Sequence, residues 1–199
     1  MRYDLKVISS WIEPGSRVMD LGCGNGELLE FLKREKQVKG FGIEGSEEKV
    51  ASCVGRGLNI LQGDINQEIL DYPDDSFDYI FVSQTLQQIS RPGILLGHLM
   101  RIGKKAIVSF PNFSHWTMRL GLLFTGNAPK NPQLPYDWHD SPNIRVITIK
   151  DFRHFIKSHG FVILKEANIN TSRQDLTGRL VKILPNLRAT YGIFKIGRK

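Results

Sequence analysis

Arg17-Val-Met-Asp-Leu-Gly-Cys-Gly-Asn-Gly26 joins a short apolar run to three closely spaced glycines. The run Arg17–Leu21 has the composition of a buried strand, and the residues of Glu27–Lys36 place leucines and a phenylalanine at helical spacing. Glycines at such a junction permit tight turns and allow a ligand to approach the backbone closely. The stretch therefore predicts a strand, a glycine turn and a helix, with a ligand site at the turn.

The residues up to Phe110 repeat this alternation of β-type runs and helical patterns, with turn residues between them. Such repetition predicts an α/β fold in which helices cover both faces of a mostly parallel sheet. The expected strands are Arg17–Leu21, Lys39–Glu44, Asn59–Gln62, Phe77–Ser83 and Lys104–Phe110, and the expected helices are Glu27–Lys36, Glu47–Val54 and Pro92–Met100.

The pattern changes in residues 111–147, which hold five of the nine prolines and many aromatic side chains. Helical spacing is found at Trp116–Phe124, and we interpret the rest of this segment as an irregular cap or lid. It covers either a substrate or the edge of the sheet. The packed cap is favoured, because aromatic side chains usually bury their large surface.

The remaining residues predict one more helix and two more strands, which completes a seven-stranded sheet. The chain is therefore expected to form a single domain, 1–199, with the irregular segment inserted before the last helix and strands. These last elements are a helix over 149–159 and strands over 161–167 and 189–196.

The composition is that of a globular protein: 199 residues, 41% hydrophobic and 24% charged. No apolar run approaches the roughly 18 residues of a membrane-spanning helix, and no signal peptide is recognisable. The two cysteines, Cys23 and Cys53, give neither a disulfide framework nor a metal-binding spacing, so we expect a cytoplasmic protein without a metal. The net charge of +7 is divided unevenly, with −5 in residues 1–100 and +12 in residues 101–199.

The glycine spacing favours a ligand without phosphates. Dinucleotide sites use G-x-G-x-x-G, whereas this turn has G-x-G-x-G followed by Glu27, whose carboxylate would repel a pyrophosphate. Acidic residues also lie at the ends of the first three strands: Asp20 and Glu44 end the first and second, and Asp64 follows the third. Such acids can accept hydrogen bonds from an ammonium, a ribose and an adenine amino group. S-adenosylmethionine carries all three groups and no phosphate, so it is the expected cofactor.

Asp20-Leu-Gly-Cys-Gly-Asn-Gly26 and Gly63-Asp64 resemble motifs of class I S-adenosylmethionine-dependent methyltransferases. The resemblance implies their Rossmann-like fold, with strand order 3-2-1-4-5-7-6 and an antiparallel last strand. The expected cofactor-binding residues lie in the glycine turn and after the strands: Asp20, Gly22, Cys23, Gly24, Asn25, Gly26, Glu44, Gly45, Asp64, Ile65 and Ser83.

Several other stretches resemble the methionine-biosynthesis family MetW. They are Gly42-Ile-Glu44, Val82-Ser-Gln-Thr-Leu-Gln-Gln88, Phe110-Pro-Asn-Phe-Ser-His-Trp116, Leu134-Pro-Tyr-Asp-Trp-His139, Pro142-Asn-Ile-Arg145 and Thr148-Ile-Lys-Asp-Phe152. Proteins of this family are associated with homoserine O-acyltransferase, the MetX protein. The resemblance therefore implies a homoserine O-acyltransferase as partner.

Two functions remain open at this stage: a cofactor-binding protein that acts with or regulates MetX, and an active methyltransferase on a small molecule. Many small-molecule methyltransferases of this class carry a histidine near the position of Gln88, and glutamine cannot act as a general base near neutral pH. The basic second half allows RNA as a third, weaker substrate class, but the chain has no Lys/Arg block of the nucleic-acid-binding type. The candidate residues on the acceptor side are Ser83, Gln84, Gln88, Asn112 and His115.

Overall fold

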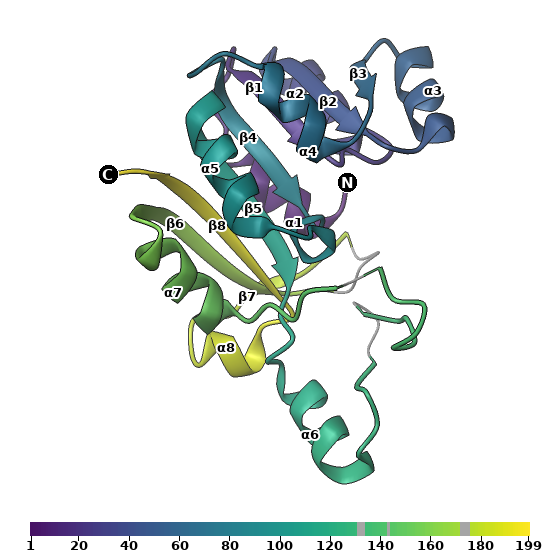
Figure 1. Cartoon of the computed structure of the whole chain (residues 1–199), viewed down its shortest axis with the longest axis vertical. Helices are drawn as coiled ribbons and strands as arrows, with labels where there is room; N and C mark the ends of the chain where they lie inside the picture. Colours follow the sequence, from purple (N-terminus) through teal and green to yellow (C-terminus); the bar gives the residue numbers. More distant parts are fainter. Residues whose placement is uncertain (131–133, 143, 172–175) are drawn as a thin grey trace.

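The structure, a computed structural model, describes residues 1–130, 134–142, 144–171 and 176–199. Strands and helices alternate through the first half of the chain (Figure 1). The strands are β1 (Arg17–Leu21), β2 (Lys39–Glu44), β3 (Asn59–Gln62), β4 (Phe77–Ser83), β5 (Gly103–Pro111), β6 (Phe161–Asn170), β7 (Arg179–Leu180) and β8 (Tyr191–Arg198). The α-helices are α1 (Tyr3–Ser9), α2 (Glu27–Lys36), α3 (Glu47–Gly55), α4 (Ile65–Glu68), α5 (Pro92–Ile102), α6 (Trp116–Thr125), α7 (Ile149–Ser158) and α8 (Pro185–Arg188). Two short 3-10 helices complete the elements, η1 (Ile69–Asp71) and η2 (Leu86–Gln88).

The strands form one sheet in the order β3-β2-β1-β4-β5-β8-β6-β7. The first five are parallel to one another, whereas β8 lies antiparallel between β5 and β6. The predicted Rossmann-like α/β fold, with its order and its antiparallel last strand, is thus confirmed. The expected count of seven strands differs from the eight observed in the described residues, because the edge strand β7 has only two residues, too few to form a sequence pattern.

The two faces of the sheet are covered by different helices. On one face, α5 and α7 contribute Leu96, Leu99, Phe152 and Ile156 to a core that also contains Phe194 of β8. On the other face, α1 and α2 pack their apolar sides, led by Ile8, Leu28 and Leu32, against β1, β4 and β8. Burial on both faces explains why β4 is a nearly continuous apolar run in the sequence.

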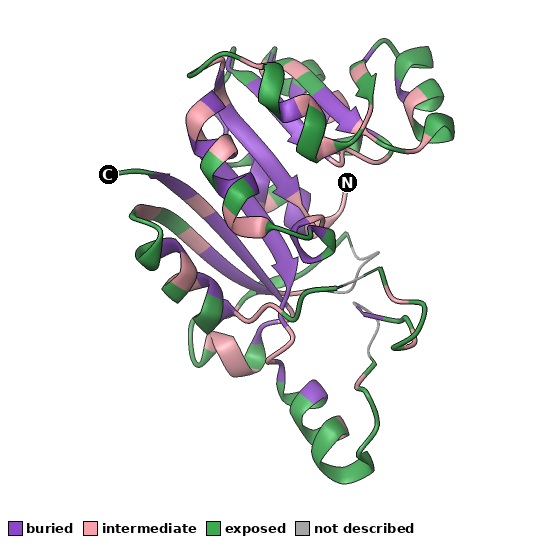
Figure 2. Ribbon diagram, in the orientation of Figure 1, coloured by how far each residue is buried: buried purple, intermediate pink, exposed green. Residues whose placement is uncertain are grey.

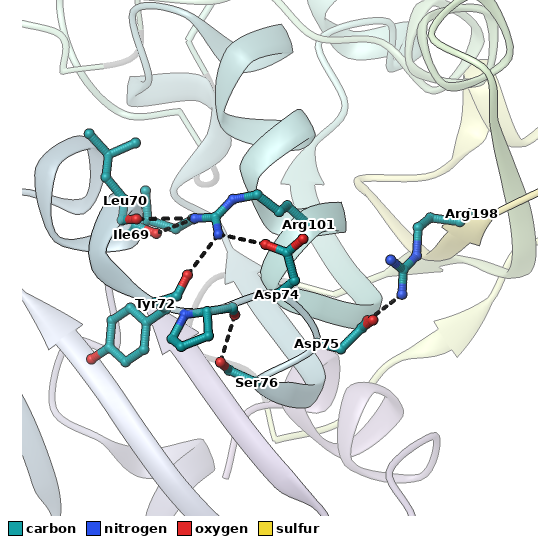
Figure 3. Close-up of polar contacts among 9 residues, drawn as sticks. Ile69, Leu70, Tyr72, Asp74, Asp75, Ser76, Arg101 and Arg198 are labelled. Atoms are coloured by element: carbon teal, nitrogen blue, oxygen red, sulfur yellow. Dashed lines mark hydrogen bonds and ion pairs between the residues drawn. The ribbon is translucent and has the colours of Figure 1, made fainter.

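Arg101, at the end of α5, organises the loop that leads into β4 (Figure 3). Its guanidinium donates hydrogen bonds to the carbonyl oxygens of Ile69, Leu70 and Tyr72 at 3.3, 3.2 and 2.7 Å, and to the Asp74 carboxylate at 2.9 Å. One side chain therefore satisfies four hydrogen-bond acceptors in a loop that is not part of the sheet. In the same loop, Asp75 forms an ion pair with Arg198 of β8.

The irregular segment contains the predicted helix, but not the predicted packing. α6 ends at Gly126, which has the positive φ of a helix-ending glycine. Figures 1 and 2 show this helix projecting from the sheet, with an exposed surface. Trp116 and Trp138 are 49% and 82% exposed, so the expected packed aromatic cap is wrong for both tryptophans.

In the described ranges, no helix has both the length and the apolar character needed to cross a membrane.

Candidate functional site

The glycine turn after β1 adopts the backbone that its sequence predicts. Gly22, Gly24 and Gly26 all have positive φ, a region that other residues rarely adopt. The N–H groups of Gly22 and Cys23 both donate to the carbonyl of Ile43, at 2.8 and 3.2 Å, which fixes the turn against β2. A Cβ atom at Gly24 would meet nothing within 4 Å, so the backbone there is bare and open to a ligand.

Glu44, at the end of β2, is tied to this turn. One carboxylate oxygen accepts from the backbone N–H of Gly24 at 2.8 Å, and the other accepts from the N–H of Ser46 at 3.0 Å. The ammonium of Lys49 lies 4.0 Å from the second oxygen. Each carboxylate oxygen can accept more than one hydrogen bond, so the fixed carboxylate keeps capacity for a ligand hydroxyl.

Asp20 is a buried acid at the end of β1. Burial raises the pKa of its carboxyl from 3.8 to about 7, while the nearby Arg2 guanidinium lowers the pKa and the Glu44 carboxylate raises it. Its Oδ1 atom is buried and has no hydrogen-bond partner among the described residues. An unpaired buried acid is costly, and a cationic donor such as an ammonium would remove that cost.

A cavity of about 590 Å³ opens over the carboxyl ends of β1, β2, β3 and β4. In open α/β sheets this edge is where ligands bind. Most of the predicted cofactor residues line the cavity, whereas Asp20, Cys23 and Gly26 stand behind its wall. The described residues that line it are Arg2, Gly22, Gly24, Asn25, Glu44, Gly45, Lys49, Gly63, Asp64, Ile65, Asn66, Ser83, Gln84, Thr85, Gln87, Gln88, Ile89, Pro111 and Tyr136.

Asp64 lines the cavity as the N-cap of α4. Its Oδ1 atom accepts from the backbone N–H of Asn66 at 2.8 Å and from the Asn66 side-chain amide at 2.9 Å. The carboxylate is therefore held at one oxygen.

Cys23 carries no reactive thiolate, because burial raises the pKa of its thiol above the ordinary value.

The end of β4 brings hydroxyl and amide groups to the cavity. The Ser83 and Ser109 hydroxyls are hydrogen-bonded at 3.0 Å, and Gln84 has a positive φ of 55°, a strained backbone for glutamine. Gln87 is 4% exposed; its amide nitrogen donates to the Gln84 carbonyl at 2.8 Å. Its Oε1 atom is buried and has no partner in the described part of the chain. Gln88 is exposed at the cavity rim.

Two predicted acceptor-side residues lie outside the cavity and make structural contacts. Asn112 donates to the carbonyls of Asn186 and Ala189 at 3.0 and 2.9 Å, which ties β5 to the α8 segment. His115 caps α6 through its Nδ1 atom, which contacts the Thr117 hydroxyl at 2.8 Å. Burial lowers the pKa of His115 below its ordinary value.

Sequence reasoning missed the part of the site that comes from the N-terminus. Arg2 lines the cavity and pairs with Asp4 through two contacts of 3.2 Å. The terminal amino group of Met1 pairs with Glu27 at 3.1 Å. The apolar spacing of Leu5 and Ile8 could have indicated α1, but no sequence pattern indicates where the polar residues in front of it lie.

The sequence matches the family described as "Methionine biosynthesis protein MetW" over residues 2–196. A relative from Rhodopirellula baltica, "Bifunctional methionine biosynthesis protein MetXA/MetW", is 34% identical over 175 residues. That match covers 83% of this chain and 28% of the relative. A second relative, the UbiE C-methyltransferase of Stenotrophomonas maltophilia, is 30% identical over 49% of this chain and 42% of its own. The chain therefore spans less than half the length of either relative.

Solved structures show the same fold. A SAM-dependent methyltransferase from Archaeoglobus fulgidus superposes with a TM-score of 0.70, at 16% identity, over 98% of this chain and 91% of its own. Magnesium protoporphyrin IX methyltransferase from Synechocystis, solved with bound SAM, gives 0.61 at 16% identity, over 98% of this chain and 78% of its own. With this fold and a family match over nearly its whole length, the chain belongs to the MetW family of methionine biosynthesis proteins.

Proposed function

We propose that this chain binds S-adenosylmethionine and acts with, or regulates, a homoserine O-acyltransferase of the MetX type. The observation that carries the proposal is the relative named MetXA/MetW, which holds both proteins in one chain. Joining two proteins on one chain raises their effective concentration, which is useful when they work in contact. Both cysteines are free thiols, which suits a place in the reducing cytoplasm.

The residues around the cavity fit S-adenosylmethionine. The Glu44 carboxylate would accept from the ribose hydroxyls and Asp64 from the adenine amino group, while Asp20, behind the cavity wall, would add negative charge near the ammonium. When bound, the cofactor supplies a methyl group on a positively charged sulfur. The acids on this side of the cavity favour such a cation.

A phosphate-bearing cofactor fits less well. Glu27 begins α2 directly after the third glycine, at the helix end where a pyrophosphate would otherwise bind. Its carboxylate at this helix end would repel a pyrophosphate. We therefore place a nucleoside without phosphate in this cavity.

The alternative function is methyl transfer to a small molecule. The observation in its favour is the space beside Gln84, Gln87 and Gln88, where a buried amide oxygen faces no protein partner among the described residues. Methyl transfer is an in-line displacement, and alignment alone can supply much of its rate. The groups at the end of β4 are amides and a hydroxyl, which do not act as general bases near neutral pH. This favours a sensor, that is, a chain that binds the cofactor without transferring its methyl group.

The first test mixes this chain with the homoserine O-acyltransferase of the same genome. We expect co-purification, and an acyltransferase rate that changes when S-adenosylmethionine is added to the pair but not when it is added to the acyltransferase alone. Absence of a complex at micromolar concentrations would make the small-molecule methyltransferase the better proposal.

The second test separates sensing from catalysis. The purified chain is incubated with methyl-labelled cofactor and homoserine, its acyl esters, homocysteine or bulk RNA. A sensor transfers no label to any of them. Turnover near an ordinary enzyme rate, about 1 s⁻¹ or more, would contradict sensing and support the alternative.

A further inference from the structure

Large apolar side chains gather on α6 and on the irregular segment after it. Leu123, Phe124 and Trp138 are 73%, 78% and 82% exposed, and Leu122 and Val146 are 55% and 72% exposed. We call these five residues the apolar face. Figure 2 shows that α6 stands clear of the sheet, with its outer surface exposed. Clusters of exposed apolar groups of this kind mark interaction sites in soluble proteins.

A groove of about 430 Å³ lies beside α6 within the same segment. Its wall is mainly apolar and is formed by Met118, Leu122, Pro129, Leu134, Tyr136 and Trp138. Met118 and Leu134 are buried at its base, whereas Arg119 and Asp137 bring charges to it. An apolar centre with aromatic anchors and charges around it is the composition of a protein–protein interface.

The groove and the cofactor cavity are neighbours, since Tyr136 lines both spaces. In addition, the backbone N–H of Arg145 donates to the carbonyl of Gln87 at 3.0 Å, and the Arg145 guanidinium contacts the carbonyl of Ser90. The segment that carries the groove is therefore bonded to the wall of the cavity that the ligand would occupy.

We infer that the apolar face and its groove are where the homoserine O-acyltransferase docks; this rests on the proposed function. The partner is argued from the fused relative. Residues 111–147, which carry the face and the groove, hold three basic and two acidic side chains, so apolar contact rather than net charge would dominate the docking. In the fused relative, the part matched by this chain is 28% of the whole, which leaves a much larger part on the same polypeptide.

The test titrates the purified acyltransferase with the whole chain and with single variants, by calorimetry. Leu123→Glu and Phe124→Glu place a charge on the apolar face and should weaken the complex roughly 30-fold or more. Val54→Glu is the matched control, since Val54 is 53% exposed on α3, at the other end of the molecule (Figure 1). Circular dichroism should show all three variants folded, and the control should bind within about twofold of the unchanged chain.

The outcomes separate the inference from the function on which it rests. If the unchanged chain does not bind the acyltransferase, the proposed function itself fails. If it binds and the two α6 variants bind equally well, the partner docks elsewhere and only the inference fails. The inference also fails if the chain forms a dimer that Leu123→Glu dissociates while the acyltransferase complex is unchanged. The face then binds a second copy of this chain.

Discussion

The side-chain amide of Gln84 donates to the Asp4 carboxylate at 2.7 Å, and this bond joins α1 to the end of β4 beside the cavity. Asp4 is 2% exposed and also accepts both contacts from Arg2. One buried carboxylate thus orients two side chains that line the cavity. Its role can be tested separately from ligand binding.

Asp4→Ala should lower the free energy of unfolding by about 2 kcal/mol, because the charged Arg2 and the Gln84 amide both lose an acceptor. Urea denaturation measures the change. Asp71→Ala, at an exposed acid near η1, is the control and should change stability little. Equal losses in the two variants would show that the Asp4 contacts contribute no net stability.

Glu44→Ala should weaken S-adenosylmethionine binding by roughly 1.5–3 kcal/mol, because a charge-assisted acceptor is lost and Gly24 is released from its bond. Calorimetry with S-adenosylmethionine, S-adenosylhomocysteine and NAD gives the comparison. Glu48→Ala, exposed on the neighbouring helix, should bind normally. Tighter binding of NAD, or no effect of Glu44→Ala, would contradict the cofactor assignment.

The buried acid Asp20 predicts a pH dependence of stability. Its pKa is raised from 3.8 to about 7 in the folded chain, so the folded state holds a proton that the unfolded state has already released between these values. The free energy of unfolding should therefore fall as pH rises from about 4 to 7, by up to about 4 kcal/mol from this group.

Asp20→Asn removes that titration. The variant should gain stability relative to the unchanged chain as the pH is raised from 5 to 8, and urea denaturation at several pH values measures the difference. Comparing the two chains cancels the other titrating groups. Parallel pH profiles would mean that Asp20 is ionised in the folded chain at both ends of the range.

The four acceptors held by Arg101 give a prediction about the loop before β4. Arg101→Ala should destabilise the chain by about 2–3 kcal/mol, and Arg101→Lys should recover less than half, because one ammonium cannot span four separated acceptors. Arg34→Ala is the control, since Arg34 is 70% exposed. Full recovery by lysine would show that charge alone matters.

If Tyr136 couples the cavity to the docking groove, ligand and partner must affect each other equally. S-adenosylmethionine should change the affinity for the acyltransferase by some factor, and the acyltransferase should change the affinity for the cofactor by the same factor. Tyr136→Ala should bring this factor close to one. An unchanged factor in the variant would place the coupling in other residues.

The sequence predicted the buried strands well because their apolar runs end sharply. Arg17–Leu21 and Phe77–Ser83 have the same bounds in the sequence analysis and in the structure. Each lies next to glycine or turn residues, so pattern and backbone change at the same place. The four-residue helices α4 and α8 are shorter than a helical period pattern and gave no signal.

The sequence indicated the candidate site residues that lie at the ends of strands. It missed those that reach the cavity through contacts between distant parts of the chain. Glu44 and Asp64 follow strands that any parallel sheet brings together. Arg2 reaches the cavity beside Asp4, which is held by a residue 80 positions away. Aromatic content likewise could not show which side chains point outward, so Trp138 was placed in a packed cap although it is 82% exposed.

The position of β8 has a consequence for how the protein emerges during synthesis. β8 is the strand that joins β6 to β5, yet β6 is made first. At roughly 5–20 residues per second, β5 has an open edge for about 4–16 s before β8 is made. Until then the other described strands form two unconnected parts, β3-β2-β1-β4-β5 and β6-β7, and the chain is most prone to aggregate just before β8 inserts between them.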